Sequence, residues 1–112
     1  MKRVVVTGLG AVTPLGVGVE RVWKRVLAGE SGISSIQAFD VSDLPCKVAG
    51  SVPPGETEDG AFNADDWVTP KNQRKMDQFI VFVIAAANMA VKDSGWVAET
   101  EEQQERSGVL IG

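Results

Sequence analysis

The chain has 112 residues, enough for one small domain with a single hydrophobic core. Hydrophobic residues make up 44% and charged residues 23%, ordinary values for a globular protein that argue against disorder across the whole chain. The net charge of −4 argues against general binding to nucleic acid or anionic membranes, and the absence of histidine removes the commonest general base and a frequent metal ligand.

The first predicted element is a buried strand at residues 4–6, where three valines stand before a glycine-rich segment. Glycines and Pro14 then predict a tight, irregular turn over residues 7–16. From Val19 the apolar residues recur at i, i+3, i+4, i+7 and i+8, which predicts a helix that ends at Gly29. The chain is therefore expected to open with a strand, a glycine turn and a helix.

The middle of the chain is predicted to be largely irregular. Residues 31–44 are typical of a loop with a short strand at Ile36, and residues 46–52 alternate loosely enough for a second short strand. Residues 55–66 are rich in aspartate and glutamate without apolar periodicity. This last segment is predicted to be an exposed acidic loop.

A long helix is predicted to begin at Thr69-Pro70, because threonine accepts a hydrogen bond from a free backbone N–H and proline is favoured at the first helical position. We expect it to run to about Ser94 and to stop at Gly95. Its apolar stretch is shorter than the roughly 20 residues that span a membrane, and it is apolar on both sides, so it should be buried in a layered protein larger than this chain. The residues expected to share its main face are Met76, Phe79, Ile80, Val83 and Ala87.

The end of the chain is predicted to hold a polar segment and a strand. Residues 99–106 are acidic and indicate a surface helix or loop, and residues 109–111 indicate a buried strand that ends directly before Gly112. Because a functional loop normally follows such a strand in α/β proteins, we expect the protein to continue beyond this point. Residues 4–6 and 109–111 are predicted to lie in one sheet with helices on both faces.

The glycine turn matches a dinucleotide-binding loop only in part. Gly8 and Gly10 follow the predicted strand, but the third glycine of G-x-G-x-x-G falls on Thr13. The helix starts only near Val19, so phosphates would not meet its N-terminus, and no acidic residue stands where ribose binding requires one. We therefore interpret the turn as structural, formed where strand and helix pack closely, and we expect no cofactor.

Cys46 is the only strong nucleophile type in the chain. A single cysteine allows no internal disulfide, which suits a reducing compartment such as the cytoplasm. Cys46 lies at no helix N-terminus, and no histidine is present to form an ion pair with its thiolate. We expect a small buried residue rather than a catalytic thiol.

Lys71, Arg74 and Lys75 place three cations in the first turns of the predicted long helix. The helix macrodipole already makes this end positive, so the arrangement is unfavourable unless an anion meets it. Their spacing of i, i+3 and i+4 predicts that they share one helix face. The residues leave two hypotheses open, an anion-binding surface or a solvated charged face partly neutralised by Asp77.

These pieces, in this order, resemble the β-ketoacyl-acyl carrier protein synthases, and most closely the type II elongating enzymes of bacterial fatty-acid synthesis. The most specific strings are V-V-V-T-G-L-G at residues 4–10, L-A-G-x-S-G-I at 27–33 and Q-R-K-M-D-x-F at 73–79. The family has a thiolase-like fold, two related α/β halves in a layered α-β-α-β-α arrangement. The resemblance therefore implies that residues 1–112 are the N-terminal segment of such a domain.

The resemblance also implies a function, the decarboxylative condensation of acyl groups with malonyl-acyl carrier protein by a cytoplasmic homodimer. The family's catalytic cysteine and two histidines lie beyond Gly112, and Cys46 does not match that cysteine, so residues 1–112 alone are expected to be inactive. The basic residues with which the family recognises its acidic carrier protein match Lys71, Arg74 and Lys75. No metal, nucleic acid or membrane insertion is expected. The alternative is a non-catalytic carrier-protein-binding module.

Overall fold

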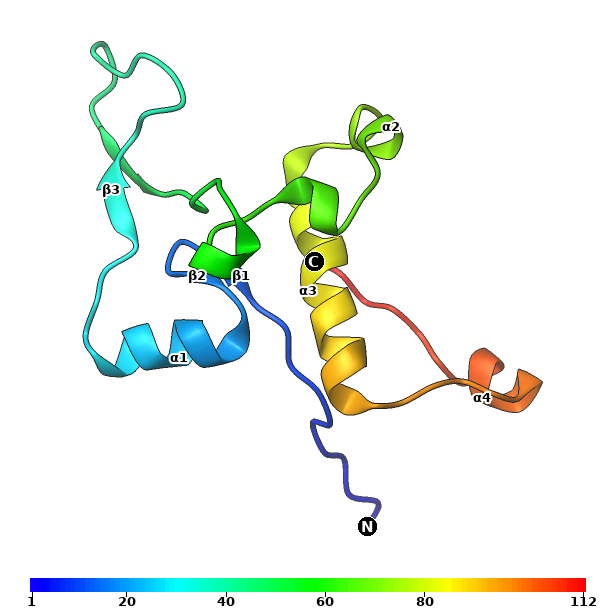
Figure 1. The fold of residues 1–112 in the computed structure, drawn as a ribbon. Coiled ribbons are helices and arrows are strands. Elements are labelled where there is room, and N and C mark those ends of the chain that lie inside the picture. Colours follow the sequence, from blue (N-terminus) through cyan, green and yellow to red (C-terminus); the bar gives the residue numbers. More distant parts are fainter.

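Short elements arranged around one long helix make up the structure, a computed structural model that describes residues 1–112 (Figure 1). The longest helix, α3, runs through the middle, and a shorter helix, α1, lies to one side of it. The elements in chain order are β1 (Val12–Thr13), β2 (Gly16–Val17), α1 (Val19–Leu27), β3 (Ile33–Ser35), β4 (Val48–Gly50), the 3-10 turns η1 (Thr57–Asp59) and η2 (Ala64–Asp66), α2 (Pro70–Gln73), α3 (Gln78–Ser94) and α4 (Glu101–Glu105).

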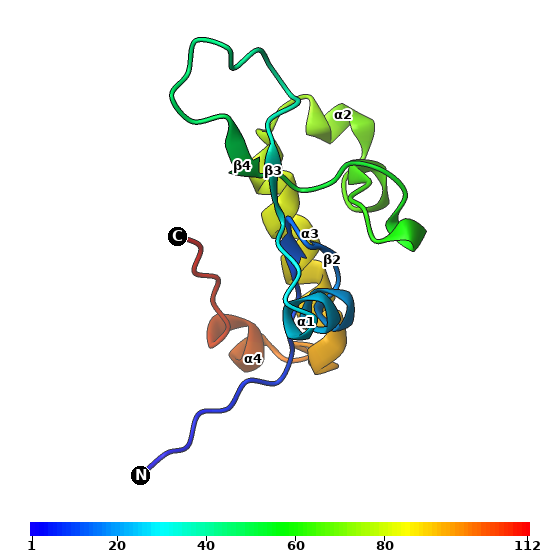
Figure 2. The ribbon, with the colours of Figure 1, turned by 90° about the vertical axis from the view of Figure 1, so that its left-hand side faces the viewer.

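The strands form two separate antiparallel pairs. β1 pairs with β2 so that Val12 faces Val17, and β3 pairs with β4 so that Ser34 faces Ala49. The glycine turn is thus a tight hairpin, in which Gly16 adopts a φ of 122° that favours glycine. The interpretation of a structural turn agrees with this geometry. The loop between β3 and β4 projects away from α3 in Figures 1 and 2.

A small core joins the hairpin, the segment before α2, and α3. Its buried residues are Val17, Phe62, Val68, Val81 and Ala85. Phe62 meets Phe82 of α3 edge to face, with ring centroids 4.8 Å apart, a geometry that aromatic pairs prefer. The prediction of an exposed acidic loop at residues 55–66 is therefore wrong in part, because Phe62 of that loop is only 6% exposed.

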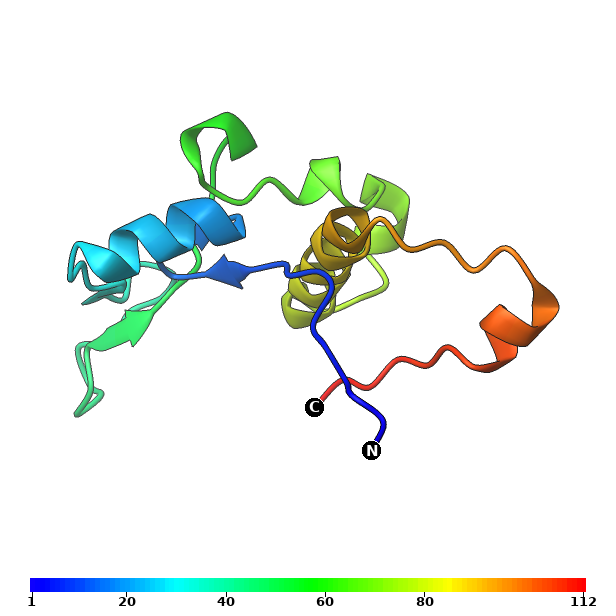
Figure 3. The same ribbon diagram turned by 90° about the horizontal axis from the view of Figure 1, so that it is seen from below.

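The strands predicted at residues 4–6 and 109–111 do not form. A strand needs a neighbour that satisfies its backbone N–H and C=O groups, and neither segment has one within this chain. Val4 is 95% exposed and Leu110 is 97% exposed. The single sheet predicted from these two segments is absent, and the chain after α3 stands away from it, carrying the surface helix α4 (Figure 3).

The helix predicted over residues 70–94 is divided in two. α2 ends after one turn, and Asp77 then takes an extended backbone as the N-cap of α3. Aspartate is favoured at N-caps, so this residue ahead of an apolar run was a signal for a second helix start. The ends predicted at Gly29 and Gly95 are confirmed, with left-handed φ values of 70° and 62°.

The face of α3 that packs on the core is the opposite of the predicted one. Val81 and Ala85 are buried, whereas Phe79 is 63% exposed and Ala87 is also exposed. A helix that is apolar all round shows the same period on either side, so periodicity cannot select the packed face.

Candidate functional site

The basic turn, which we define as Lys71, Arg74 and Lys75, lies on the surface at α2. All three side chains are exposed. Because α2 has only four residues, Arg74 is its C-cap and Lys75 follows the helix. The prediction that the three cations share the face of a long helix is therefore wrong. They lie on one turn of backbone and the bend that follows it, without a long helix macrodipole beneath them.

The backbone that carries the basic turn begins where the sequence indicated, but its cap differs. Thr69 has the extended conformation of an N-cap and Pro70 occupies the first helical position. The Thr69 side chain makes no capping hydrogen bond; its backbone carbonyl accepts from the N–H groups of Asn72 and Gln73 at 2.9 and 3.0 Å. The predicted threonine side-chain cap is absent.

No ion pair occupies the cations of the basic turn. The chain forms two ion pairs, Arg25 with Glu30 and Arg106 with Glu102, and both lie elsewhere. Asp77, which the solvated-face hypothesis paired with these cations, makes no ion pair with them. The three charges are therefore free to meet an anionic partner.

Two carboxylates just before the basic turn are held by neutral donors. The Gln73 side-chain amide donates to Asp65 Oδ1 at 2.8 Å, and the Thr57 hydroxyl donates to Asp66. Gln73 also donates to the backbone carbonyl of Val68 at 2.6 Å. Sequence reasoning missed Gln73 and Thr57, because each contact joins residues eight or nine positions apart with no helical or strand period between them.

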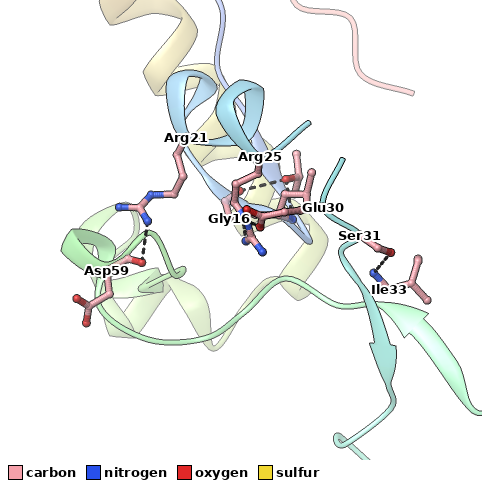
Figure 4. A network of polar contacts seen from close by, with 9 residues as sticks. Gly16, Arg21, Arg25, Glu30, Ser31, Ile33 and Asp59 are labelled. Carbon is pink, nitrogen blue, oxygen red and sulfur yellow. Dashed lines mark hydrogen bonds and ion pairs between the residues drawn. The ribbon is translucent and has the colours of Figure 1, made fainter. Parts of the chain in front are cut away.

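A second feature is an open groove of about 810 Å³ between the β3–β4 pair and the start of α3. Arg25 is the only ionisable residue that lines it. The Arg25 guanidinium is occupied, because it donates to the Leu15 carbonyl at 2.6 Å and pairs with Glu30 (Figure 4). Serine hydroxyls line the groove, but no base lies beside them, so the groove holds no catalytic constellation.

Arg21 also has a structural role. Its guanidinium donates to the backbone carbonyl of Asp59 at 3.1 Å and lies against Gly60, so it ties α1 to η1 (Figure 4).

On the loop between β3 and β4, the side-chain hydroxyl and backbone N–H of Ser42 donate to Asp40. These hydrogen bonds hold the pKa of that carboxyl below its ordinary value.

Cys46 is exposed, so the expectation of a buried residue is wrong. It lies near the end of the loop between β3 and β4, and its thiol donates to the Val48 carbonyl at 3.3 Å. No three histidine, cysteine, aspartate or glutamate residues gather closely enough to hold a metal ion. None of the helices has the length and apolar character needed to cross a membrane.

Comparison with known proteins gives consistent matches over the whole chain. The family described as "Beta-ketoacyl synthase, N-terminal domain" matches residues 1–112. A 3-oxoacyl-acyl-carrier-protein synthase 2 of Rhizobium meliloti is 53% identical over 112 residues, which are all of this chain and 27% of the relative. A protein of the same name from Vibrio cholerae is 42% identical over 99% of this chain and 25% of the relative.

A solved structure agrees with these sequences. A chain of the ishigamide ketosynthase/chain length factor superposes with a TM-score of 0.69 and 31% identity, covering 88% of this chain and 22% of that one. The predicted α/β class and thiolase-like fold are confirmed by this match. The chain spans about a quarter of the length of the relatives that it matches.

Proposed function

The chain belongs to the β-ketoacyl synthase family as its N-terminal domain, and from this premise we propose that it is part of a 3-oxoacyl-acyl carrier protein synthase. Such an enzyme joins an acyl group to malonyl-acyl carrier protein with loss of carbon dioxide, in fatty-acid elongation. The identity of 53% over the whole chain with a relative of that name supports the proposal.

The residues described here would serve as framework and recognition surface. The chain has no histidine, and its one thiol, Cys46, has no base beside it. The cysteine and histidines of the condensation would therefore come from outside residues 1–112. We propose that the complete enzyme is a homodimer that works in the cytoplasm and needs no cofactor, although relatives from Schizosaccharomyces pombe and Arabidopsis thaliana are named as mitochondrial.

The basic turn is proposed as the docking surface for acidic acyl carrier protein, loaded with acyl or malonyl groups. The observation that carries this proposal is that Lys71, Arg74 and Lys75 are exposed and unpaired, while the preceding carboxylates are held by Gln73 and Thr57. Unpaired charges of one sign attract an oppositely charged partner. This attraction raises the association rate and weakens as the salt concentration rises.

Charge reversal of Arg74 in the complete enzyme tests this proposal. For Arg74→Glu we expect KM for carrier-bound substrate to rise roughly tenfold, equivalent to about 1.4 kcal/mol, with the effect reduced at high salt. The rate with a small thioester that lacks the carrier should be unchanged. Thermal stability should also hold, because Arg74 is exposed and makes no ion pair.

Lys24→Glu is the matched control, since Lys24 is an exposed, unpaired cation on α1 and the charge change is the same. It should leave KM for carrier-bound substrate and the rate with the small thioester unchanged. If Arg74→Glu lost activity equally with carrier-bound and carrier-free substrates, the hypothesis of a structural, solvated basic face would be supported instead. If the complete protein formed no ketoacyl product from any substrate, the alternative of a non-catalytic carrier-binding module would stand.

A further inference from the structure

The basic turn rests on a helix that is too short to hold its own shape. α2 has four residues, and isolated helices shorter than about 12 residues are marginal in water. The Thr69 side chain adds no cap, and Lys71, Arg74 and Lys75 are all exposed, so none of them anchors the turn. The geometry of the turn must therefore be set by its other contacts.

Gln73 supplies a contact of this kind from within α2. Its side-chain nitrogen donates both to Asp65 Oδ1 at 2.8 Å and to the Val68 carbonyl at 2.6 Å, so its amide hydrogens are both used. Val68 is 8% exposed and belongs to the core, which makes its carbonyl a fixed point. One side chain thus ties α2 to the core and to η2.

The same contact also determines where a negative charge lies. Asp65 is exposed and accepts from Gln73, while none of the cations in the basic turn pairs with it. A released Asp65 could swing toward the neighbouring cations and neutralise part of their charge. The Gln73 amide therefore both orients the basic turn and restrains the Asp65 carboxylate.

We infer that Gln73 is a positioning residue for carrier docking, acting by clamping α2 to Asp65 and Val68 so that Lys71, Arg74 and Lys75 stay in place and unpaired. This inference rests on the proposed function of the basic turn. Gln73 carries no charge, so its effect is on the arrangement of the cations and not on the net charge of the surface.

The test replaces Gln73 by methionine in the complete enzyme, which keeps the length of the side chain and removes its donors. KM for carrier-bound substrate should rise about two- to tenfold, the range that the net strength of a hydrogen bond gives to an equilibrium. The value of kcat, the rate with a small carrier-free thioester and Tm should stay near those of the unchanged enzyme. The salt dependence of kcat/KM should persist, because all three cations remain.

Asn72→Met is the matched control, because Asn72 is the neighbouring exposed residue of α2 and its side chain makes no hydrogen bond. It should change KM neither for carrier-bound substrate nor for the carrier-free thioester. Equal effects of Gln73→Met on carrier-bound and carrier-free substrates, or no effect on either, would overturn the inference. An unchanged KM for carrier-bound substrate in Arg74→Glu would instead overturn the proposed docking function itself.

Asp65→Ala removes the acceptor of the Gln73 hydrogen bond, and it replaces Gln73→Met as the test if that variant does not fold. Removing a carboxylate beside a basic surface should by itself strengthen attraction for an acidic carrier and lower KM. Loss of the clamp should raise KM, and we expect a rise of about twofold or more. A fall in KM would show that Asp65 acts only as a charge and would refute the positioning role.

Discussion

Gly8 and Gly10 determine how closely the N-terminal segment crosses α3. A Cβ atom on Gly10 would lie 1.9 Å from the Ala86 carbonyl oxygen, and one on Gly8 would lie 2.2 Å from the Ala90 carbonyl oxygen. Both obstacles are backbone atoms of a helix, which cannot rotate away as a side chain can. The glycines that suggest a nucleotide-binding loop in the sequence therefore have a packing role in the structure.

Gly10→Ala in the complete protein should consequently be destabilising. We expect the free energy of unfolding to fall by about 1–3 kcal/mol, as for other overpacked sites, because the segment must move off α3. Denaturant unfolding followed by circular dichroism measures this. A neutral Gly10→Ala would contradict the close packing.

Single residues were predictable where their chemistry is local. The exposure of Lys71, Arg74 and Lys75 follows from their charge, and both hypotheses for the basic turn require it. The exposure of Cys46 and the contact between Gln73 and Asp65 were not predictable. Both depend on where a loop lies relative to distant parts of the chain, which no residue near them specifies.

At the scale of elements, two threonine N-caps act differently. Thr100 begins α4 with a capping box, in which its hydroxyl accepts from the Gln103 N–H and the Gln103 side chain accepts from the Thr100 N–H. Thr69 also begins α2 with an extended backbone, but its φ is −61° against −110° at Thr100, and its side chain makes no hydrogen bond. The residue type is the same, so only the geometry separates a threonine that caps from one that does not.

This contrast predicts unequal effects of the same substitution. Thr100→Ala should weaken the α4 turn by about 0.5–2 kcal/mol, seen as faster hydrogen exchange of the Gln103 amide. Thr69→Ala should change exchange at Asn72 and Gln73 little, because those amides bond to the Thr69 backbone carbonyl. A similar increase in hydrogen exchange at both helices would show that the residue type, and not the side-chain hydrogen bond, stabilises the helix start.

The ends of elements were more predictable than their continuity. Glycine stops after α1 and α3 are signals carried by one residue, because left-handed backbone favours glycine. The break at Asp77 competed with a strong apolar pattern and was missed. The strands at residues 4–6 and 109–111 have the right composition but need hydrogen-bonding partners, and composition does not supply a partner.

At the scale of the whole molecule, residues 1–112 form an open shape. The radius of gyration is 17.0 Å, against about 13 Å for a compact domain of this length. The accessible surface is 9113 Å², against about 6,000 Å² for a folded monomer of this mass. Only 7 of 112 residues are buried, so much of the apolar surface that the sequence provides is left uncovered.

Several of the uncovered apolar residues lie along the segments that the sequence predicts as buried strands and on the outer side of α3. These include Val4, Val5, Val6, Phe79, Val91, Val109, Leu110 and Ile111. Exposed apolar surface of this extent favours association. The sequence predicts that these segments are buried, and residues 1–112 by themselves do not bury them.

Leu110 gives the sharpest test of this reasoning, because one substitution should act in opposite directions. The isolated residues 1–112 should associate, bind hydrophobic dyes and melt without a sharp transition; Leu110→Ser should reduce that association, measured by sedimentation velocity. In the complete protein the same substitution should lower the free energy of unfolding by about 2–5 kcal/mol, because a polar group replaces a packed side chain. A cooperatively melting monomer for the isolated residues, or an unchanged stability of the complete protein, would show that this apolar surface needs no cover.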